Sequence, residues 1–346
     1  MSSVRMEVQR RYALSLPGEL LGAALLVTGE PVVVCAGGAP GVVIAAPFGH
    51  PRSGSSAPLR AGALVQLRGE GPVFVAPNHE LGELLVMVGG DEPSIFGVDC
   101  GQARPLWRLL MEGPPVGPPL LWRGLTLVAD PPGALTALDL AGRERWICDL
   151  GSAPSTGPAA VDGERAVIGA ADGGLHLVDG VGGRLGGWSM GGRIEALCVG
   201  PRGRVVGCGG GLMSAFEVGR REPLWSAPAE GVVSMAADPR GNLTAALADG
   251  GVIRVEAGGQ ARRSVLQGDR IRGLELTTSG AVVGIRRPAE GSAGLVAWPL
   301  PSPPAGWQVG AEGRPLSGEP VAAVHGSHFT SVFCRGGEVF EVTIQS

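Results

Sequence analysis

Side chains able to bind a metal ion or to form a covalent intermediate are sparse in this sequence. His325 and His328 flank a Gly-Ser pair, and imidazoles at this spacing could share a metal ion. A zinc site needs a third or fourth ligand, and no Cys, His or carboxylate accompanies the pair at a ligand spacing. We therefore interpret both histidines as turn residues, and His176, which lies within an apolar run, as a packed residue. The sequence predicts no metal site and no cofactor.

The motifs of the common covalent and phosphate-binding sites are also missing. There is no Gly-x-Ser-x-Gly nucleophile elbow, no GxxxxGK[ST] phosphate loop and no dinucleotide-binding fingerprint between a strand and a helix. All 28 basic residues are Arg, which excludes a lysine Schiff base. Carboxylates such as Asp91 and Glu92 are adjacent in sequence, whereas glycosidase chemistry needs two carboxylates across a cleft. No catalytic residue is predicted.

The cysteines do not form a recognisable metal or redox motif. Six are present, at Cys35, Cys100, Cys148, Cys198, Cys208 and Cys334. Most lie in or beside apolar runs and none forms a CxxC pair, which favours buried free thiols over disulfides and a reducing compartment. We therefore expect a cytoplasmic protein, with the periplasm as the alternative.

The first 35 residues have some features of an export signal. Arg10 and Arg11 precede a mostly apolar stretch at 20–27. Pro17, Gly18 and Glu19 interrupt the pattern, no A-x-A cleavage site follows it, and the residue before Cys35 does not fit a lipobox. We interpret this segment as β-strands, and no stretch of the chain is long enough to span a membrane.

Net charge argues against a polyanionic partner. The chain carries 28 basic and 32 acidic residues, which gives a formal net charge of −4, and both signs are spread along its length. Since non-specific binding to nucleic acid or to an anionic membrane needs a basic surface, neither partner is expected.

The elements that must position any functional side chain are short strands. The 346 residues include 60 Gly and 29 Pro, yet 44% of the chain is hydrophobic. The apolar residues come in short runs such as 125–129, each bounded by Gly, Pro or Asp, and no amphipathic helical stretch of useful length occurs. The sequence therefore predicts an all-β protein.

These strands repeat with a period of about 40 residues, a length typical of propeller blades. In each unit an apolar strand ends on an acidic residue, a Gly-containing turn follows, and a Trp comes seven to nine residues after the acid. The acids are Asp99, Asp139, Asp179 and Glu217. Tight turns such as 172–174 precede these strands, so that each unit is predicted to be a four-stranded meander.

This order resembles the PQQ-like propeller repeat, A-x-D-x-x-T-G-x-x-x-W. The segment from Ala137 to Trp146 is the most similar copy, with Ala141 where the pattern has Thr. The resemblance is clear over about 84–260, and within these residues the Gly-His and Trp-Asp signatures of the alternative WD40 repeat are absent. It implies that a Trp docks each blade against the next, a role that falls on Trp107, Trp146, Trp188, Trp225 and Trp307.

Counting the units predicts one β-propeller of eight four-stranded blades over residues 1–346. The predicted blades are 18–68, 69–112, 113–150, 151–190, 191–228, 229–267, 268–312, and a last one that combines 318–346 with 1–16. In the last blade an N-terminal strand joins three C-terminal strands, which would close the ring and remove exposed sheet edges. Seven blades stay open as an alternative, because the first and seventh units are irregular.

Arginine is unevenly placed along the repeat. If the turns between first and second strands and between third and fourth strands lie on one side of the disc, nine arginines gather toward one rim: Arg123, Arg143, Arg145, Arg165, Arg202, Arg204, Arg220, Arg221 and Arg240. Arg is enriched at protein interfaces and binds carboxylates with two hydrogen bonds, so this rim is the predicted partner surface. The alternative is a solvated rim neutralised by its own acids: Glu144, Asp162, Glu164, Glu222 and Asp238.

Two hypotheses for function follow. The first is a non-catalytic scaffold of a bacterial multiprotein system that binds protein partners through face loops; the PQQ-like resemblance includes outer-membrane assembly lipoproteins and intracellular propellers encoded beside ATPases. The second is a ligand-binding or cofactor-binding propeller enzyme that uses the central channel. The absence of adjacent cysteines and the presence of only two Asn, Asn78 and Asn242, disfavour a quinone site. The scaffold is the preferred prediction.

Overall fold

The computed structural model describes residues 5–16, 18–25, 31–36, 41–47, 59–69, 72–78, 83–249, 251–265, 269–276, 282–288, 294–298, 320–325, 330–335 and 338–345. These residues form β-sheets in which all strand pairs but one are antiparallel, and their only helical element is one 3-10 turn, η1 (Pro201–Gly203). The prediction of an all-β protein is confirmed. No helix long and apolar enough to cross a membrane occurs in these described segments.

Five successive sheets in the middle of the chain each contain four strands in chain order. The first two are β6 (Val73–Asn78), β7 (Glu83–Val88), β8 (Ser94–Asp99), β9 (Arg104–Leu110), and β10 (Leu120–Trp122), β11 (Leu125–Asp130), β12 (Ala134–Leu138), β13 (Glu144–Asp149). The third and fourth are β14 (Ala159–Ala160), β15 (Arg165–Gly169), β16 (Gly174–Asp179), β17 (Arg184–Ser189), and β18 (Ile194–Gly200), β19 (Arg204–Gly209), β20 (Leu212–Phe216), β21 (Trp225–Pro228). The fifth is β22 (Val232–Ala237), β23 (Leu243–Leu247), β24 (Gly251–Val255), β25 (Ala261–Val265).

The two ends of the chain contribute to one eight-stranded sheet in the order β2-β3-β4-β5-β1-β31-β30-β29. Its strands are β1 (Arg5–Ser15), β2 (Leu20–Leu25), β3 (Pro31–Ala36), β4 (Gly41–Pro47), β5 (Leu59–Arg68), β29 (Pro320–His325), β30 (Thr330–Cys334) and β31 (Glu338–Gln345). A three-stranded sheet precedes β29: β26 (Asp269–Leu276), β27 (Val282–Pro288) and β28 (Gly294–Trp298). The segment with the features of an export signal thus forms strands β1 and β2.

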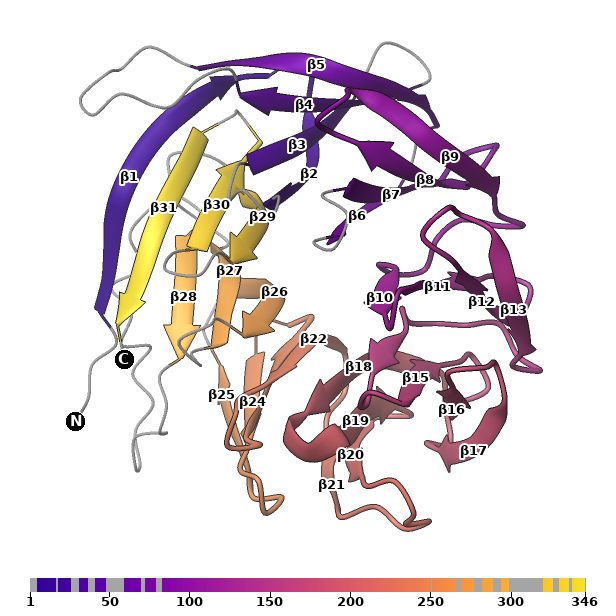
Figure 1. Ribbon diagram of the computed structural model, residues 1–346. Helices are drawn as coiled ribbons and strands as arrows, with labels where there is room; N and C mark the ends of the chain where they lie inside the picture. Colours follow the sequence, from indigo (N-terminus) through magenta and orange to yellow (C-terminus); the bar gives the residue numbers. More distant parts are fainter. Residues whose placement is uncertain are drawn as a thin grey trace.

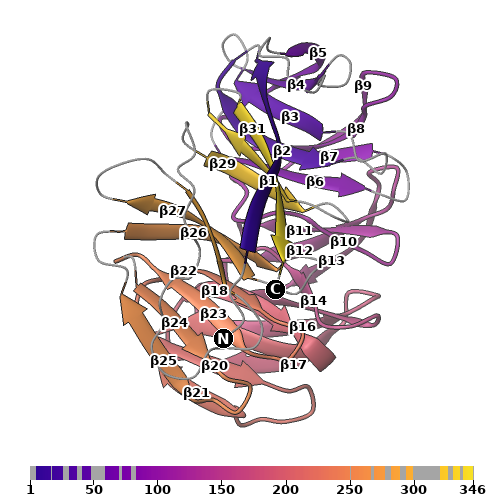
Figure 2. The ribbon, with the colours of Figure 1, turned by 90° about the vertical axis from the view of Figure 1, so that its left-hand side faces the viewer.

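Strand β1 pairs with β31 in antiparallel orientation, from Arg5 opposite Gln345 to Ala13 opposite Glu338. Its last residues turn to β5, with Leu14 paired in parallel to Leu59. Figure 1 shows the sheets following one another around a common centre, with β1 in indigo beside β31 in yellow. Figure 2 shows the same pair from the side. The first strands of neighbouring sheets contact one another in succession from β2 through β6, β10, β14, β18 and β22 to β26, and β2 also contacts β29 at the other end of its own sheet.

The core lies between the sheets. The middle strands are buried on both faces, as in β12, whereas the outermost strand β9 is largely exposed. Apolar residues of neighbouring sheets form shared clusters, such as the one in which Leu127 and Ala137 meet Ile168 and Val178. Because both faces of each sheet are apolar, each sheet needs a neighbour on either side, and this requirement produces the array.

The acidic residue of the repeat shapes the turn that follows it. Asp139 Oδ1 accepts the backbone N–H groups of Ala141 and Arg143, both at 2.9 Å. Asp179 Oδ1 accepts those of Val181 at 3.0 Å and Gly183 at 2.7 Å. A carboxylate at this point therefore fixes the turn between the third and fourth strands, and with it the place of the following Trp.

Candidate functional site

Four of the five repeat tryptophans lie on the outermost strand of one sheet and contact the turn between the third and fourth strands of the next. Trp146 Nε1 donates to the carbonyl oxygen of Gly180 at 3.2 Å, and Trp188 Nε1 donates to that of Arg220 at 2.7 Å. Trp188 also stacks on Phe216, with ring centroids 5.1 Å apart. Trp307 lies outside the described residues.

The other two tryptophans make the contact without this hydrogen bond. Trp107 packs against Gly142 and Trp225 against Gly259, so closely that a Cβ on either glycine would overlap the Trp side chain. Their Nε1 atoms are buried and have no hydrogen-bond partner within the described segments. Glycine is required in these turns because the indole occupies the space of a side chain.

Trp122 makes a similar contact that sequence reasoning missed. It ends the first strand β10, and its Nε1 donates to the carbonyl oxygen of Asp162 at 2.9 Å in the next sheet. The Arg123 guanidinium lies over its ring, 5.9 Å from the centroid. Trp122 does not belong to the repeated pattern in which a strand, an acidic residue, a turn and a Trp follow one another. The one feature of the sequence that could have indicated its role is a Trp-Arg-Gly turn between two apolar runs.

All nine predicted arginines lie in or beside turns that join first to second or third to fourth strands of the sheets from β10 to β25. We call the edge that these turns form the arginine face. The turns after the first strands β10, β14, β18 and β22 carry Arg123, Arg165, Arg202, Arg204 and Arg240. The turns after the third strands β12 and β20 carry Arg143, Arg145, Arg220 and Arg221. In an antiparallel meander these two classes of turn share one edge of the sheet.

Several of these arginines bind within the protein. Arg165 pairs with Asp162, Arg220 Nε lies 3.2 Å from Glu217 Oε2, and Arg145 Nη1 lies 4.0 Å from Asp139 Oδ2. Arg204 is half-buried and donates from Nη1 to the carbonyl oxygen of Ala257 at 3.0 Å, which links two sheets. These four side chains are therefore engaged within the protein, and Arg204 among them joins neighbouring sheets.

Arg123 lies over the Trp122 ring, and the remaining four, Arg143, Arg202, Arg221 and Arg240, are exposed. Their guanidinium groups make no hydrogen bond or ion pair with any residue that the structure describes. Arg202 has a φ of 62°, in the left-handed region that a non-glycine residue rarely adopts, and this backbone conformation belongs to the turn η1. These four are the side chains of the arginine face that can reach a partner.

The acidic residues expected to neutralise the arginine face differ in how exposed their carboxylates are. Asp238 is 1% exposed; its carboxylate accepts the backbone N–H groups of Arg240 and Asn242, both at 2.9 Å. It also lies 3.4 Å from the buried Arg254, whose pKa is lowered mainly by burial and raised in part by Asp238. Hydrogen bonds from Arg165 lower the pKa of Asp162. Of the five acids, only Glu144, Glu164 and Glu222 are exposed.

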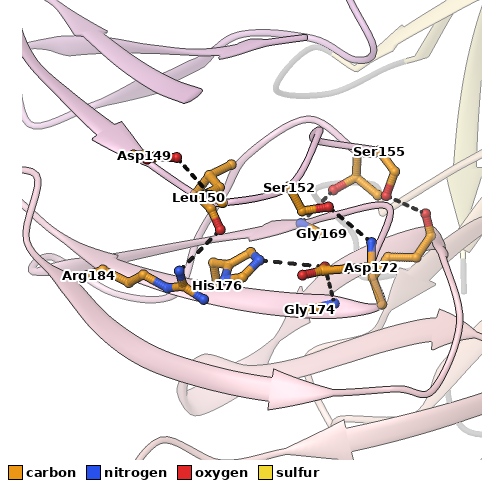
Figure 3. Close-up of polar contacts among 12 residues, drawn as sticks. Asp149, Leu150, Ser152, Ser155, Gly169, Asp172, Gly174, His176 and Arg184 are labelled. Atoms are coloured by element: carbon orange, nitrogen blue, oxygen red, sulfur yellow. Dashed lines mark hydrogen bonds and ion pairs between the residues drawn. The ribbon is translucent and has the colours of Figure 1, made fainter. Parts of the chain in front are cut away.

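At the opposite edge, a polar group forms where the sheets β10–β13 and β14–β17 meet (Figure 3). His176 on β16 is 3% exposed, and its Nε2 lies 3.9 Å from Asp172 Oδ1, too far for a hydrogen bond. Arg184 donates from Nη1 to the carbonyl oxygen of Leu150 at 3.1 Å. Burial lowers the pKa of His176, nearby Arg184 lowers it further and Asp172 opposes the change. The interpretation of His176 as a packed residue agrees with its burial.

No group of three or more His, Cys, Asp or Glu residues that could hold a metal ion occurs among the described residues. His325 lies at the end of β29, and His328 lies outside the described residues. Burial raises the pKa of the Cys35 and Cys100 thiols to about 11 and of the Cys198 and Cys208 thiols to about 12. These thiols are therefore protonated at neutral pH and are poor nucleophiles.

Comparisons with known proteins agree with this architecture. Among solved structures, the chain is similar to BamB from Moraxella catarrhalis, with 14% identity, a TM-score of 0.62 and 98% of both chains covered. It is also similar to the computationally designed protein Ika8, with 15% identity, a TM-score of 0.65, and 97% and 100% of the chains covered. The WD40 β-propeller domain of Doa1 matches with 14% identity, a TM-score of 0.58, and 81% and 93% covered. At these identities the likeness shows a β-propeller fold.

The search of curated protein sequences found no match. The model of a PQQ-like family, described as outer membrane protein assembly factor BamB, matches residues 61–264. That segment contains the Asp139 and Trp146 turn from which the PQQ-like resemblance was drawn, and it is more than half of the 346 residues. On this match and on the propeller architecture, the chain belongs to the PQQ-like, BamB-type β-propeller family.

Proposed function

We propose that this protein is a non-catalytic scaffold that binds a protein partner through the arginine face. The observation that carries the proposal is the set of four exposed arginines, Arg143, Arg202, Arg221 and Arg240, whose guanidinium groups make no hydrogen bond or ion pair with the described residues. Two of their turns are fixed by carboxylates: Asp139 binds the backbone N–H of Arg143, and Asp238 binds that of Arg240. A rigid backbone lowers the entropy lost when such a surface binds a partner.

The partner that suits this face carries carboxylates. A guanidinium group binds a carboxylate with two parallel hydrogen bonds, and Arg is enriched in protein interfaces. Two of the acids that could neutralise the face, Asp162 and Asp238, are already engaged in their own turns. We therefore expect an acidic segment of a partner protein to bind across these turns.

The complete ring is part of this proposal. We infer a single domain of eight blades with the boundaries given above, in which β1 completes the blade of β29, β30 and β31. Its support is the long pairing of β1 with β31, together with the contact between β2 and β29. A ring joined by its two chain ends would present the arginine face as one rigid surface.

The description of the family suggests the cellular compartment in which the protein acts. Because that family is described as outer membrane protein assembly factor BamB, we propose that the chain takes part in outer-membrane assembly and acts in the periplasm. The expectation of a cytoplasmic protein finds no support in these comparisons. Buried protonated thiols such as Cys198 and Cys208 are compatible with either compartment.

Affinity purification from the native host tests the scaffold. Tagged wild-type protein is compared by mass spectrometry with a triple variant, Arg202→Ala, Arg221→Ala and Arg240→Ala. Arg204 is left intact because it links two sheets. The matched control removes three exposed arginines outside the arginine face: Arg68→Ala, Arg108→Ala and Arg193→Ala.

The first triple variant should lose its captured partner, while the control variant, which changes the net charge equally, should keep it. Both should show the thermal unfolding of the wild type within a few degrees. If the first variant captures the partner as well as the wild type does, the arginine face is not the binding surface.

A further inference from the structure

Acidic side chains gather on the edge opposite to the arginine face. Nine of them lie in or beside turns that join second to third strands, or in the connections between sheets, over residues 83–251; we call this edge the acidic face. They are Asp91, Glu92, Glu112, Asp130, Asp149, Asp172, Glu195, Glu230 and Asp249. Four arginines come near these turns: Arg108, which is paired with Glu92 at 2.8 Å, Arg184, which binds the carbonyl oxygen of Leu150, and Arg68 and Arg193. The described part of this edge is therefore strongly negative.

The carboxylates of the acidic face point to solvent more than those of the arginine face do. Eight of the nine residues are exposed, and the ninth, Asp130, is half-buried. In the turns, a single oxygen accepts a backbone N–H: Asp149 Oδ1 from Gly151, and Asp172 Oδ1 from Gly174, at 2.8 and 2.9 Å. This bond fixes the direction of the carboxylate and leaves its second oxygen for another donor.

A buried imidazole provides an independent sign of a ligand at this edge. The His176 side chain is 4% exposed, and its Nε2 has no hydrogen-bond partner in the described part of the chain. The ring reaches toward Asp172 over Gly174, where a Cβ would lie 2.6 Å from Nε2 (Figure 3). An unsatisfied buried nitrogen costs free energy, and a donor held by Asp172 would remove that cost.

The charges around His176 determine which kind of hydrogen-bond donor from a ligand would bind its Nε2 atom. The exposed Asp172 faces the ring, and Asp149 precedes Leu150 on the neighbouring sheet (Figure 3). Arg184, the positive group of this region, is held by the carbonyl oxygen of Leu150. A neutral imidazole accepts a hydrogen bond through Nε2, and a carboxylate binds an ammonium or guanidinium group more strongly than it binds a neutral donor.

We propose that the acidic face binds a cationic segment of a protein partner, with one Arg or Lys side chain held by Asp172 and His176. This inference goes beyond the scaffold function proposed above, because it concerns the other face and a partner of opposite charge. A disc with one arginine face and one acidic face would join a basic protein segment to an acidic one.

Fluorescence anisotropy tests the proposal with a fluorescein-labelled peptide of alternating Arg and Ser. The test variant is Asp149→Asn, Asp172→Asn, Glu195→Gln and Glu230→Gln. The matched control is Glu144→Gln, Glu164→Gln, Glu217→Gln and Glu222→Gln on the arginine face. Each set removes four negative charges and so raises the formal net charge from −4 to 0. The test variant should bind the peptide about tenfold or more weakly, and the control should differ from the wild type by less than about twofold.

NMR of the imidazole resonances locates the peptide. The His176 signal, assigned by its loss in His176→Gln, should move on addition of the Arg-Ser peptide and stay in place with a Gly-Ser peptide. The proposal is overturned if both fourfold variants weaken binding equally, since net charge alone would then explain it. It is also overturned if the His176 signal does not move, or if MgCl2 alone moves it and excludes the peptide.

The arginine-face triple variant should bind the Arg-Ser peptide as the wild type does. Failure of the acidic-face proposal and failure of the scaffold proposal are therefore separate results.

Discussion

The indole Nε1 of Trp146 donates a hydrogen bond to the carbonyl oxygen of Gly180, 3.2 Å away in the next sheet. The ring also lies against Gly182, where the φ of +86° and a Cβ position 2.9 Å from the indole both call for glycine. The outermost strand of one sheet is thereby joined to a turn of its neighbour by a bond and by a close contact.

Replacing Trp146 by Phe should lower the free energy of unfolding by about 1–2 kcal/mol, because a half-buried hydrogen bond and part of the ring contact are lost. Trp107→Phe is the matched control: Trp107 occupies the same place one sheet earlier, but its buried Nε1 has no partner in the described residues. The loss in the free energy of unfolding should be clearly smaller for Trp107→Phe than for Trp146→Phe. Urea denaturation measures both, and equal costs would show that the hydrogen bond to Gly180 contributes nothing.

Asp238 and Asp162 occupy equivalent turns but should differ in their contribution to stability. Asp238→Ala removes the ion-pair partner of the buried Arg254 and three hydrogen bonds in the turn, so we expect a loss of about 3 kcal/mol. Asp162→Ala should cost about 1 kcal/mol, because Asp162 and Arg165 are partly solvated. The midpoints of urea unfolding compare the two variants. A loss for Asp162→Ala as large as that for Asp238→Ala would contradict this account.

Arg204 and Arg202 are two residues apart and should respond differently to truncation. Arg204→Ala removes the hydrogen bond to the carbonyl oxygen of Ala257 in the next sheet, and a loss of about 1–2 kcal/mol is expected. Arg202→Ala removes an exposed side chain, and a change within about 0.5 kcal/mol is expected. Thermal melts of the two single variants are the measurement. A larger loss for Arg202→Ala would show that its side chain supports the fold.

His176 should make stability depend on pH. Its pKa in the folded protein lies below the ordinary value of 6.5, mainly because it is buried and also because Arg184 is near, while Asp172 opposes the shift. The unfolded chain therefore binds the proton more readily. The stabilisation is complete above the unfolded pKa and is lost as the pH falls through that value toward the lower folded pKa, by about 1.4 kcal/mol for each unit of difference.

Unfolding of the wild type and of His176→Gln, followed between pH 8 and pH 5, measures this contribution. The wild type should lose more stability than the variant over the acidic part of the range. Parallel curves for the two proteins would mean that His176 titrates alike in the folded and unfolded chains.

Much of the architecture was predictable because it depends on local order. The short apolar runs between Gly, Pro and Asp specify strands and turns, and the acid before the turn does so by binding backbone N–H groups, as Asp139 and Asp179 do. Trp146 and Trp188 could be singled out because they recur at the same place in this order. Trp122 could not, because it follows no repeat.

The candidate site was less predictable. The sequence placed nine arginines on one rim, yet their spacing does not distinguish Arg204, which binds Ala257 in another sheet, from Arg202, which is exposed. Nor does it reveal that Asp238 is buried against Arg254 while Glu222 is exposed. The acidic face went unnoticed because the sequence does not distinguish its exposed carboxylates, such as Asp172, from turn acids such as Asp238 that are buried in the fold.

The sequence by itself determined the strands, their turns and the family pattern, because hydrophobic period, glycine conformation and Asp capping act over a few residues. Only the tertiary structure decided which charges are used inside the molecule and which are left for a partner. Arg204 and Ala257, or Arg184 and Leu150, meet only after the sheets pack, and the resulting burial lowers the pKa of His176.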